Sequence, residues 1–190
     1  MKSYIILTVV ALCLIGVTSA IAQPAGDVLF TVTVATTPLT VTAGAVTIAA
    51  GLVAGNQQTI TPAGDGTALE QAGSNPVAAN LDVTMDPTNV LGDPGAAVLI
   101  SFALPSRLYP SGGAGSGSVA CTYGGTSACY LDAAGNIVYF DPRIPIKAFL
   151  DPGAGDINVY LGGNFTVAPN STPDDYLGDA IVTATYVANE

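Results

Sequence analysis

Short segments that alternate between apolar and polar residues run along most of the chain. Between residues 28 and 34 every second side chain is apolar and large, namely Val28, Phe30, Val32 and Val34. A period of two places these four side chains on one face of a β-strand. Further β-prone segments occupy residues 39–46, 59–61, 81–85, 97–104, 119–123, 128–131, 136–140, 156–161, 164–167 and 180–187. This spacing predicts an antiparallel β-sandwich or barrel.

Glycine, proline and aspartate separate these segments. The sequences at 93–95 and 151–153 are both Asp-Pro-Gly, which is typical of tight turns. The glycine- and serine-rich stretch at 111–118 predicts a surface loop rather than a domain linker, because strand patterns continue on both sides. The helical signal is weak and consists of a capping box over Thr67–Glu70. We therefore expect an all-β protein.

The first 22 residues have the layout of a secretory signal peptide. Lys2 provides a positive start, residues 4–17 are almost wholly apolar, and Ala20 and Ala22 are small residues at the positions that a signal peptidase reads. The alternative is a transmembrane anchor, for which the apolar stretch is short. We expect cleavage after Ala22, export through the periplasm to the cell surface or medium, and one mature domain over residues 23–190.

The predicted mature chain is acidic but carries few charges. Its cations are Arg107, Arg143 and Lys147, which against 14 acidic residues give a formal charge of −11. Without a basic patch the chain is not expected to bind nucleic acid. Only 9% of all residues are charged and the mean hydropathy is +0.52, so the chain carries more apolar surface than a solitary soluble domain needs. This favours burial against protein partners.

Two cysteines remain after the predicted cleavage. Cys121 and Cys129 enclose the sequence CTYGGTSAC, in which Gly124 and Gly125 are typical of a tight turn. Because exported proteins meet an oxidising environment, we predict a disulfide that staples a peripheral hairpin, with two free thiols as the alternative. Such a bridge would contribute roughly 2–3 kcal/mol to stability.

The residue types that common catalytic sites need are scarce. Histidine is absent, which excludes serine–histidine triads and the usual zinc sites. Asp151 and Asp156 flank a Pro-Gly turn, and Asp174 and Asp175 are adjacent, so calcium binding is conceivable. The full calcium-loop spacing is missing, and solvated turn residues are the preferred interpretation. A hydrolase with paired carboxylates is a further alternative, but we expect no enzyme, no cofactor and no metal site.

The most specific pattern lies near the carboxyl end. Gly162 and Gly163 separate two strand segments and predict a two-residue hairpin turn. The last segment alternates, with Val182, Ala184 and Tyr186 on one face and Ile181, Thr183 and Thr185 on the other.

Together with Tyr176 and Gly178, these residues resemble the ending of a bacterial pilin-like family, the domain-of-unknown-function family numbered 4402, and more distantly spore-coat-U-type and common-pilus subunits. That ending consists of a Gly-Gly hairpin, a Tyr-x-Gly and an alternating strand that closes on Tyr. The family often has Phe-Gly where this chain has Ala50-Gly51. The resemblance implies an immunoglobulin-like, pilin-type sandwich that lacks its final strand. The amino-terminal extension of a neighbouring subunit fills the gap.

The segment at about 27–36 fits the role of the donated strand. Burial of its four apolar side chains would contribute on the order of 6–12 kcal/mol, and backbone hydrogen bonds would set the register. The alternative is an ordinary first strand that pairs within its own domain. The sequence thus predicts a structural subunit of a fimbria-like filament with a role in adhesion. Its partners would be other copies of itself, a periplasmic chaperone and an outer-membrane assembly protein.

The alternative function is a monomeric, secreted β-sandwich that binds a carbohydrate or a protein. In that case exposed aromatic side chains should cluster, and the candidates near the cysteines are Tyr109, Tyr123, Tyr130 and Tyr139. Tyrosine is also common in ordinary strands, and this is the simpler interpretation of the four residues.

Overall fold

The computed structural model describes residues 37–50, 52–73, 82–112 and 115–188. All of them belong to the unit Thr36–Glu190. The predicted signal peptide (1–22) and the predicted donor strand (Val28, Phe30, Val32 and Val34) lie outside the described residues. The described part is all-β, as the alternation predicts. It holds no helix with the length and hydropathy that a membrane crossing requires.

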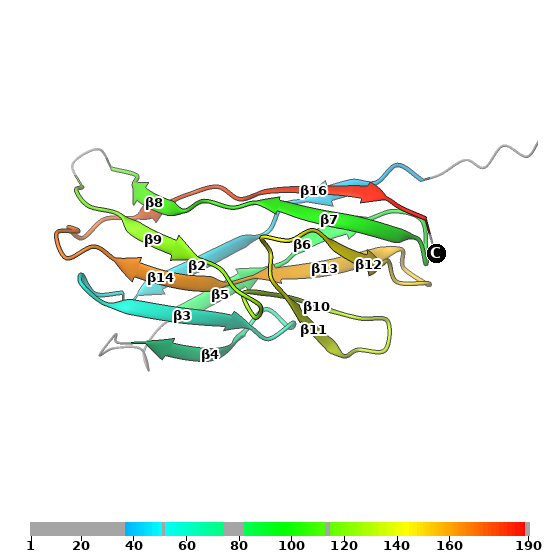
Figure 1. Ribbon diagram of the computed structural model, residues 1–190, viewed down its shortest axis with the longest axis horizontal. Coiled ribbons are helices and arrows are strands. Elements are labelled where there is room, and N and C mark those ends of the chain that lie inside the picture. Colours follow the sequence, from blue (N-terminus) through cyan, green and yellow to red (C-terminus); the bar gives the residue numbers. More distant parts are fainter. Residues whose placement is uncertain (1–36, 51, 74–81, 113–114, 189–190) are drawn as a thin grey trace, which may run out of the picture. The chain divides into compact units, whose positions relative to one another are not determined.

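The strands are short. In chain order they are β1 (Thr40–Thr42), β2 (Ala45–Ala50), β3 (Gln57–Pro62), β4 (Ala68–Gly73), β5 (Asp82–Asp86), β6 (Thr88–Leu91), β7 (Ala97–Ala103), β8 (Arg107–Pro110), β9 (Val119–Thr122), β10 (Ala128–Leu131), β11 (Ile137–Phe140), β12 (Ile146–Phe149), β13 (Asp156–Leu161), β14 (Gly163–Val167), β15 (Tyr176–Leu177) and β16 (Ile181–Tyr186). Interruptions of one to three residues split longer strands into the pairs β1/β2, β5/β6, β7/β8, β13/β14 and β15/β16 (Figure 1).

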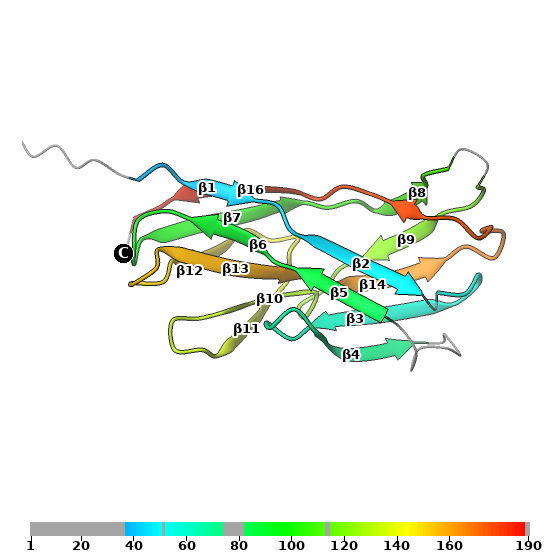
Figure 2. The ribbon, with the colours of Figure 1, turned by 180° about the vertical axis from the view of Figure 1, so that it is seen from behind.

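Antiparallel pairing arranges the strands into two layers. In one layer the sheet β12-β7-β16 is continued by the sheet β15-β8-β9-β14-β3-β4. In the other layer the sheet β1-β6-β13-β10-β11 is continued by the pair β2-β5. Figures 1 and 2 show the two layers from opposite sides. This is the antiparallel sandwich architecture that the sequence predicts.

Two hydrophobic clusters fill the space between the layers. The first core contains Val90, Val98, Ile100, Ala128, Phe140, Ala148, Leu150, Ile157 and Val159. The second core contains Ile60, Met85, Val119, Cys121, Cys129, Tyr160, Phe165 and Val167. Along β16 the exposure alternates, and Val182, Ala184 and Tyr186 pack against the first core. The two faces predicted for the last strand are therefore confirmed.

The expected hairpin at Gly162 and Gly163 is wrong. Strands β13 and β14 do not pair with each other, because β13 pairs with β6 and β10 whereas β14 pairs with β3 and β9. The chain instead passes at Gly162 from one layer to the other. A Cβ at Gly162 would collide with the carbonyl oxygen of Ile60, so glycine serves a close backbone approach here rather than a turn.

The expected peripheral hairpin around the cysteines is also wrong. The backbone does turn at Gly124, whose carbonyl oxygen accepts a bond from the N–H of Ser127 at 3.0 Å. However, β9 pairs with β8 and β14, whereas β10 pairs with β11 and β13. The turn therefore connects the two layers instead of joining two paired strands.

The capping box does not start a helix, because residues 68–73 form strand β4, which pairs with β3. Four further strands, β6, β8, β12 and β15, do not follow from the pattern. The first three have four residues each and β15 has two, which is too short for the alternation to stand out.

Candidate functional site: an open groove between two edge strands

Two edges lie on the same side of the sandwich, one formed by β2 and the other by β15 and β16. Among the described strands, β2 pairs only with β5, β16 only with β7 and β15 only with β8. The N–H and C=O groups on the other side of each edge therefore have no described ladder partner. Such an edge is a template for pairing with a further strand.

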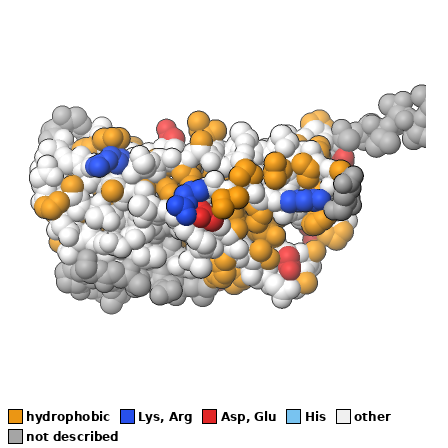
Figure 3. Space-filling model, viewed as in Figure 1, with side chains coloured by type: hydrophobic (Ala, Val, Ile, Leu, Met, Phe, Trp, Pro, Cys, Tyr) orange, Lys and Arg blue, Asp and Glu red, His pale blue; other side chains and the backbone are white. Residues whose placement is uncertain are grey.

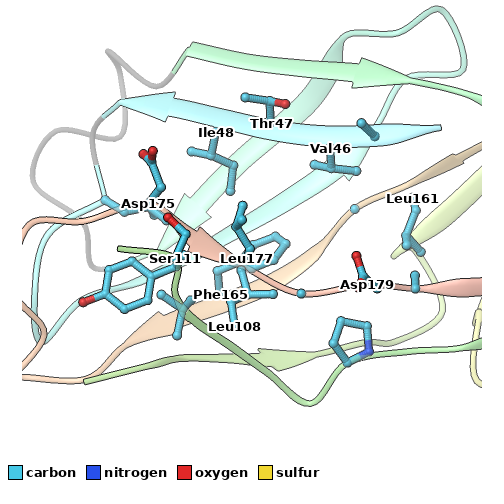
Figure 4. Close-up of a pocket in the computed structure, with 18 of the residues that line it drawn as sticks. Val46, Thr47, Ile48, Leu108, Ser111, Leu161, Phe165, Asp175, Leu177 and Asp179 are labelled. Carbon is cyan, nitrogen blue, oxygen red and sulfur yellow. The ribbon is translucent and has the colours of Figure 1, made fainter. Parts of the chain in front are cut away.

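A groove of about 1010 Å³ separates these two edges. Its walls include Ala43–Ile48 from one edge and Tyr176–Ala180 with Val182 from the other. In Figure 4, Val46 and Ile48 point from β2 into the cavity, while Thr47 points away from it. Most of the large apolar side chains that line the groove belong to the second core or pack on it, namely Val46, Ile48, Leu52, Leu108, Val119, Phe165 and Val167, whereas Val159, Leu161 and Val182 belong to the first core or pack on it. The groove thus opens directly onto the second core.

The rim of the groove is acidic, whereas its floor is apolar. The carboxylates that line it are those of Asp86, Asp174, Asp175 and Asp179. At the end of the groove formed by β15, the Tyr176 hydroxyl is 2.8 Å from the carbonyl oxygen of Ser116 and 2.7 Å from that of Thr172. These bonds join strand β15 to the loops on either side of it and support the rim.

At the other end the same two edges come together. The Tyr186 hydroxyl at the end of β16 donates to the Thr37 carbonyl oxygen over 2.8 Å and accepts from the Asp93 N–H over 2.8 Å. The Thr37 N–H donates to Asp93 Oδ1 over 2.7 Å. We call these three residues the clamp. A Cβ at Gly92 would collide with the Tyr186 hydroxyl, so the clamp requires a glycine beside it.

The structure brings most of the carboxyl-terminal motif to this pair of edges. Gly162, Tyr176, Gly178 and Val182 line the groove, and Tyr186 closes its far end. A Cβ at Gly178 would lie 2.7 Å from Leu108 Cδ2, which explains the glycine by close packing. The remaining motif residues lie beside the groove: Gly163 lies against the ring of Tyr123, and Ala184 packs on the first core.

The clamp partners Thr37 and Asp93 were not expected from the sequence. The Asp93-Pro94-Gly95 pattern predicted only a turn, and a turn is present, with the Ala96 N–H bonded to the Asp93 carbonyl oxygen over 3.1 Å. Hydrogen bonds from the side chain of Thr37 and from its backbone N–H also hold the pKa of Asp93 below its ordinary value. Nothing in the local sequence indicates that the Asp93 carboxylate meets a residue 56 positions away.

Both cysteines are buried in the second core and come from opposite layers, Cys121 from β9 and Cys129 from β10. In the structure they are free thiols, and the disulfide stays a prediction. Burial raises the pKa of both thiols, that of Cys129 to about 11. A reduced pair would therefore hold little of the reactive thiolate.

The four tyrosines of the alternative hypothesis do not form one surface. Tyr109 on β8 is 60% exposed, whereas the Tyr123 hydroxyl donates to the Pro105 carbonyl oxygen over 3.0 Å. Tyr130 packs its ring 6.2 Å from that of Phe140, towards the first core. Tyr139 lies on the opposite face of the neighbouring strand, since its register partner is Cys129. Stacking of a sugar on this set as a whole is therefore not supported.

The aspartates in the turns accept hydrogen bonds from backbone N–H groups of the same turn. Oxygen Oδ1 of Asp151 accepts the N–H groups of Gly153 and Ala154 over 2.8 and 2.6 Å, and these bonds lower its pKa. Asp174 Oδ1 likewise accepts the N–H of Asp175 over 2.8 Å. Within the described ranges no group of three or more His, Cys, Asp or Glu residues could hold a metal ion. The bonds at Asp151 and Asp174 match the interpretation of these carboxylates as turn residues.

A second candidate surface is the outer face of the sheet β12-β7-β16. It carries exposed Leu99, Phe149 and Ile181, and the ammonium of Lys147 lies 5.7 Å from the centroid of the Phe149 ring. Figure 3 shows this side with hydrophobic patches and few charged side chains. Unlike the groove, this face has no free strand edge in its middle, because β7 is paired on both sides.

No family model matches the chain, and neither a curated protein nor a solved structure matches it. The groove and the clamp are therefore the observations from which a function can be argued.

Proposed function

We propose that the protein is a structural subunit of an extracellular or cell-surface filament, in which each copy receives a β-strand from a neighbour in the groove between β2 and β15/β16. The observation that carries the proposal is the groove itself. It combines two free strand edges with an apolar floor, which are the two features that strand addition uses.

The second core supports the proposal because it is less well sealed than the first. Five residues of the first core are fully buried at 0% exposure, whereas in the second core only Ile60 and Cys129 are. Partly buried side chains surround both cores, but those around the second core that line the groove are Val46, Ile48, Leu52, Leu108, Tyr123 and Tyr176, compared with Leu161 and Val182 around the first core. An added strand would cover them.

The segment Val28–Val34 has a length and an apolar alternation that suit the groove. At about 3.3 Å per residue it spans about 20 Å, similar to the roughly 17 Å of the wall residues Ala43–Ile48. Its alternation would direct one apolar face to the floor, and its backbone could pair with both edges. The same proposal assigns the fold to the immunoglobulin-like, pilin-type sandwiches, which a strand from a neighbouring subunit completes.

The test uses two complementary variants of the mature protein. Phe30→Asp damages the donated face, and Ile48→Asp damages the groove. Each variant alone is expected to stay monomeric, whereas an equimolar mixture should give dimers and no longer species, because only one donor and one groove remain intact. Thr47→Asp is the matched control, since Thr47 is exposed and points away from the cavity (Figure 4).

Size-exclusion chromatography with light scattering measures the species, and electron microscopy shows whether the unaltered protein forms filaments. The proposal fails if the unaltered mature protein is monomeric, or if the Phe30→Asp variant polymerises as well as the unaltered protein does.

A further inference from the structure

A second, smaller pocket lies beside strand β13, and we call it the small pocket. Its volume is about 320 Å³. The side chains that matter for its chemistry are those of Leu131, Asp132, Asp151, Asp156, Asn158 and Tyr160. None of the residues that line it lines the groove, so the site does not rest on the proposed function. We propose that the small pocket binds a neutral sugar unit, such as the terminal hexose of a glycan.

One face of β13 supplies three of the polar side chains. Asp156, Asn158 and Tyr160 alternate along the strand and therefore share a face, whereas Ile157 and Val159 belong to the first core. Successive members of the polar set start about 7 Å apart along the strand. A ligand the size of a monosaccharide can therefore contact two neighbours of the set at once.

Asn89 on the adjacent strand β6 orients two of these side chains. Its Nδ2 donates to Asp156 Oδ2 over 3.1 Å and to Asn158 Oδ1 over 2.9 Å. Among the described residues, Asp156 Oδ1 and Asn158 Nδ2 have no hydrogen-bond partner. Asn89 is thus a positioning residue, which leaves one acceptor and one donor available side by side.

Tyr160 gives the independent indication of a ligand. The residue is only 9% exposed and belongs to the second core, and a tyrosine hydroxyl in such surroundings normally has a hydrogen-bond partner. Within the described ranges no group bonds to the Tyr160 hydroxyl. Burial and, after it, the charge of Asp65 raise the pKa of Tyr160, so the hydroxyl keeps its proton and can donate as well as accept. A ligand in the small pocket would supply the missing partner.

Two turn carboxylates and one apolar side chain complete the small pocket. Asp132 uses both oxygens for the turn that contains Asn136. Asp151 uses Oδ1 for the N–H groups of its turn, and its Oδ2 has no partner among the described residues. Leu131 is 43% exposed, so it offers an apolar surface to the C–H groups of a sugar ring.

This combination of groups selects a ligand with several hydroxyl groups. A hydroxyl can donate to a carboxylate and accept from an amide or a phenol, and the small pocket offers acceptors at Asp151 and Asp156 beside donors at Asn158 and Tyr160. Its carboxylates would repel an anionic ligand. A metal ion does not fit either, because in the part of the chain that the structure describes no group of three or more His, Cys, Asp or Glu residues could hold one.

The experiment titrates the full mature chain with the methyl glycosides of glucose, galactose and mannose. Saturation-transfer NMR observes the ligand and therefore works for single copies and for assemblies. We expect millimolar binding of at least one glycoside, because so small a site buries little of a ligand. Tyr160→Phe and Asn158→Ala should each weaken that binding about fivefold or more, since each leaves a sugar hydroxyl without its partner.

The matched controls are Tyr109→Phe and Asn170→Ala. Both residues are exposed and neither lines the small pocket, so both variants should bind like the unaltered protein. The proposal is overturned if none of the three glycosides gives a transfer signal, or if Tyr160→Phe and Asn158→Ala bind like these controls.

Two further probes test the class of ligand. N-acetylneuraminic acid carries a carboxylate and should bind more weakly than the best glycoside. Equal binding of this anionic sugar, or binding of arginine amide without binding of any glycoside, would overturn the assignment of a neutral sugar. A monomeric unaltered protein that binds a glycoside through Tyr160 and Asn158 would support this proposal and overturn the proposed function.

Discussion

The two ends of the sandwich use the same pair of edges in opposite ways. At the clamp end, the edge that starts with β1 meets β16, and one tyrosine hydroxyl joins Thr37 and Asp93 across the gap. At the groove end, β2 and β15 stay apart and leave a cavity of about 1010 Å³. A sandwich can therefore be sealed locally by three hydrogen bonds and one close glycine contact, while the same edges stay open a few residues away.

The two cores should also differ in what they stabilise, the single copy or the assembly. The first core is completed by residues of its own chain, including Leu39 and Tyr186. The second core leaves Val46, Ile48 and Leu52 partly buried beside the groove. If a neighbour supplies the missing cover, changes in the first core should act on the single copy, and changes at the groove should act mainly on the assembly.

The largest expected difference is between isoleucines of the two cores. Ile100 is fully buried in the first core, and Ile100→Ala should lower the free energy of unfolding by about 2–5 kcal/mol. Ile48→Ala at the groove should cost roughly 1 kcal/mol or less in a single copy, because Ile48 is only partly buried there. Urea denaturation of both variants in a monomeric Phe30→Asp background gives the comparison. Equal losses would show that the second core is as complete as the first.

The next effect concerns the cysteines of the second core. Cys121 and Cys129 come from opposite layers, so a disulfide would tie the layers together where the core is open. We expect the protein, expressed with its predicted signal peptide, to resist alkylation in denaturant until it is reduced, and replacement of both cysteines by alanine to cost about 2–3 kcal/mol. Full alkylation without a reductant, seen by mass spectrometry, would establish two free thiols instead.

A smaller loss is expected when the clamp is pushed open. In Gly92→Ala the new methyl group would collide with the Tyr186 hydroxyl and lie 2.8 Å from Leu39 Cδ1. The resulting shift should cost about 1–3 kcal/mol. The matched control is Gly124→Ala, because a Cβ there would meet no described atom within 4 Å, and it should change stability by less than about 0.5 kcal/mol. Similar melting curves for both variants would contradict the close contact.

Removal of a single hydroxyl at each end should have a still smaller effect. Tyr186→Phe and Tyr176→Phe each remove hydrogen bonds at one end of the edges, and each should cost about 0.5–1.5 kcal/mol. Local hydrogen exchange distinguishes the two variants. The amide of Asp93 should exchange faster in Tyr186→Phe but not in Tyr176→Phe, since only Tyr186 accepts its proton. Faster exchange of Asp93 in both variants would show that the ends are not independent.

The alternation along the sequence was sufficient for the all-β architecture and for the two faces of the last strand. It fails at Gly162, Gly163 and the cysteine turn, where a local turn signal does not mean that the flanking strands pair. A glycine can instead permit close approach to a strand distant in sequence, as Gly162 does with Ile60. Composition does not distinguish these two uses of glycine.

The groove could be anticipated only in part. The motif residues Tyr176, Gly178 and Val182 do border it, and Tyr186 closes one end. The opposite wall was not foreseen, because Val46 and Ile48 look like ordinary strand residues and their exposure depends on which strands are neighbours. The bonds that join Thr37 and Asp93 depend on long-range pairing in the same way, since β1 meets β6 and β16 only in the folded sandwich.

The smallest effect concerns the charge of Asp93 in the clamp. Hydrogen bonds from the side chain and the backbone N–H of Thr37 lower the pKa of this carboxyl below its ordinary value of 3.8. A lowered pKa in the folded state means that the carboxylate stabilises the fold above the ordinary pKa, and that this contribution is lost as the pH falls through the lowered value. The amide resonance of Thr37 should therefore titrate with a midpoint below pH 3.8. In Asp93→Asn the titration should vanish, while Tyr186 still links Thr37 to residue 93 through the backbone. A midpoint at or above the ordinary value would show that the bond between Thr37 and Asp93 does not hold the clamp end in solution. The clamp end would then lack the weakest of the contacts that distinguish it from the groove end.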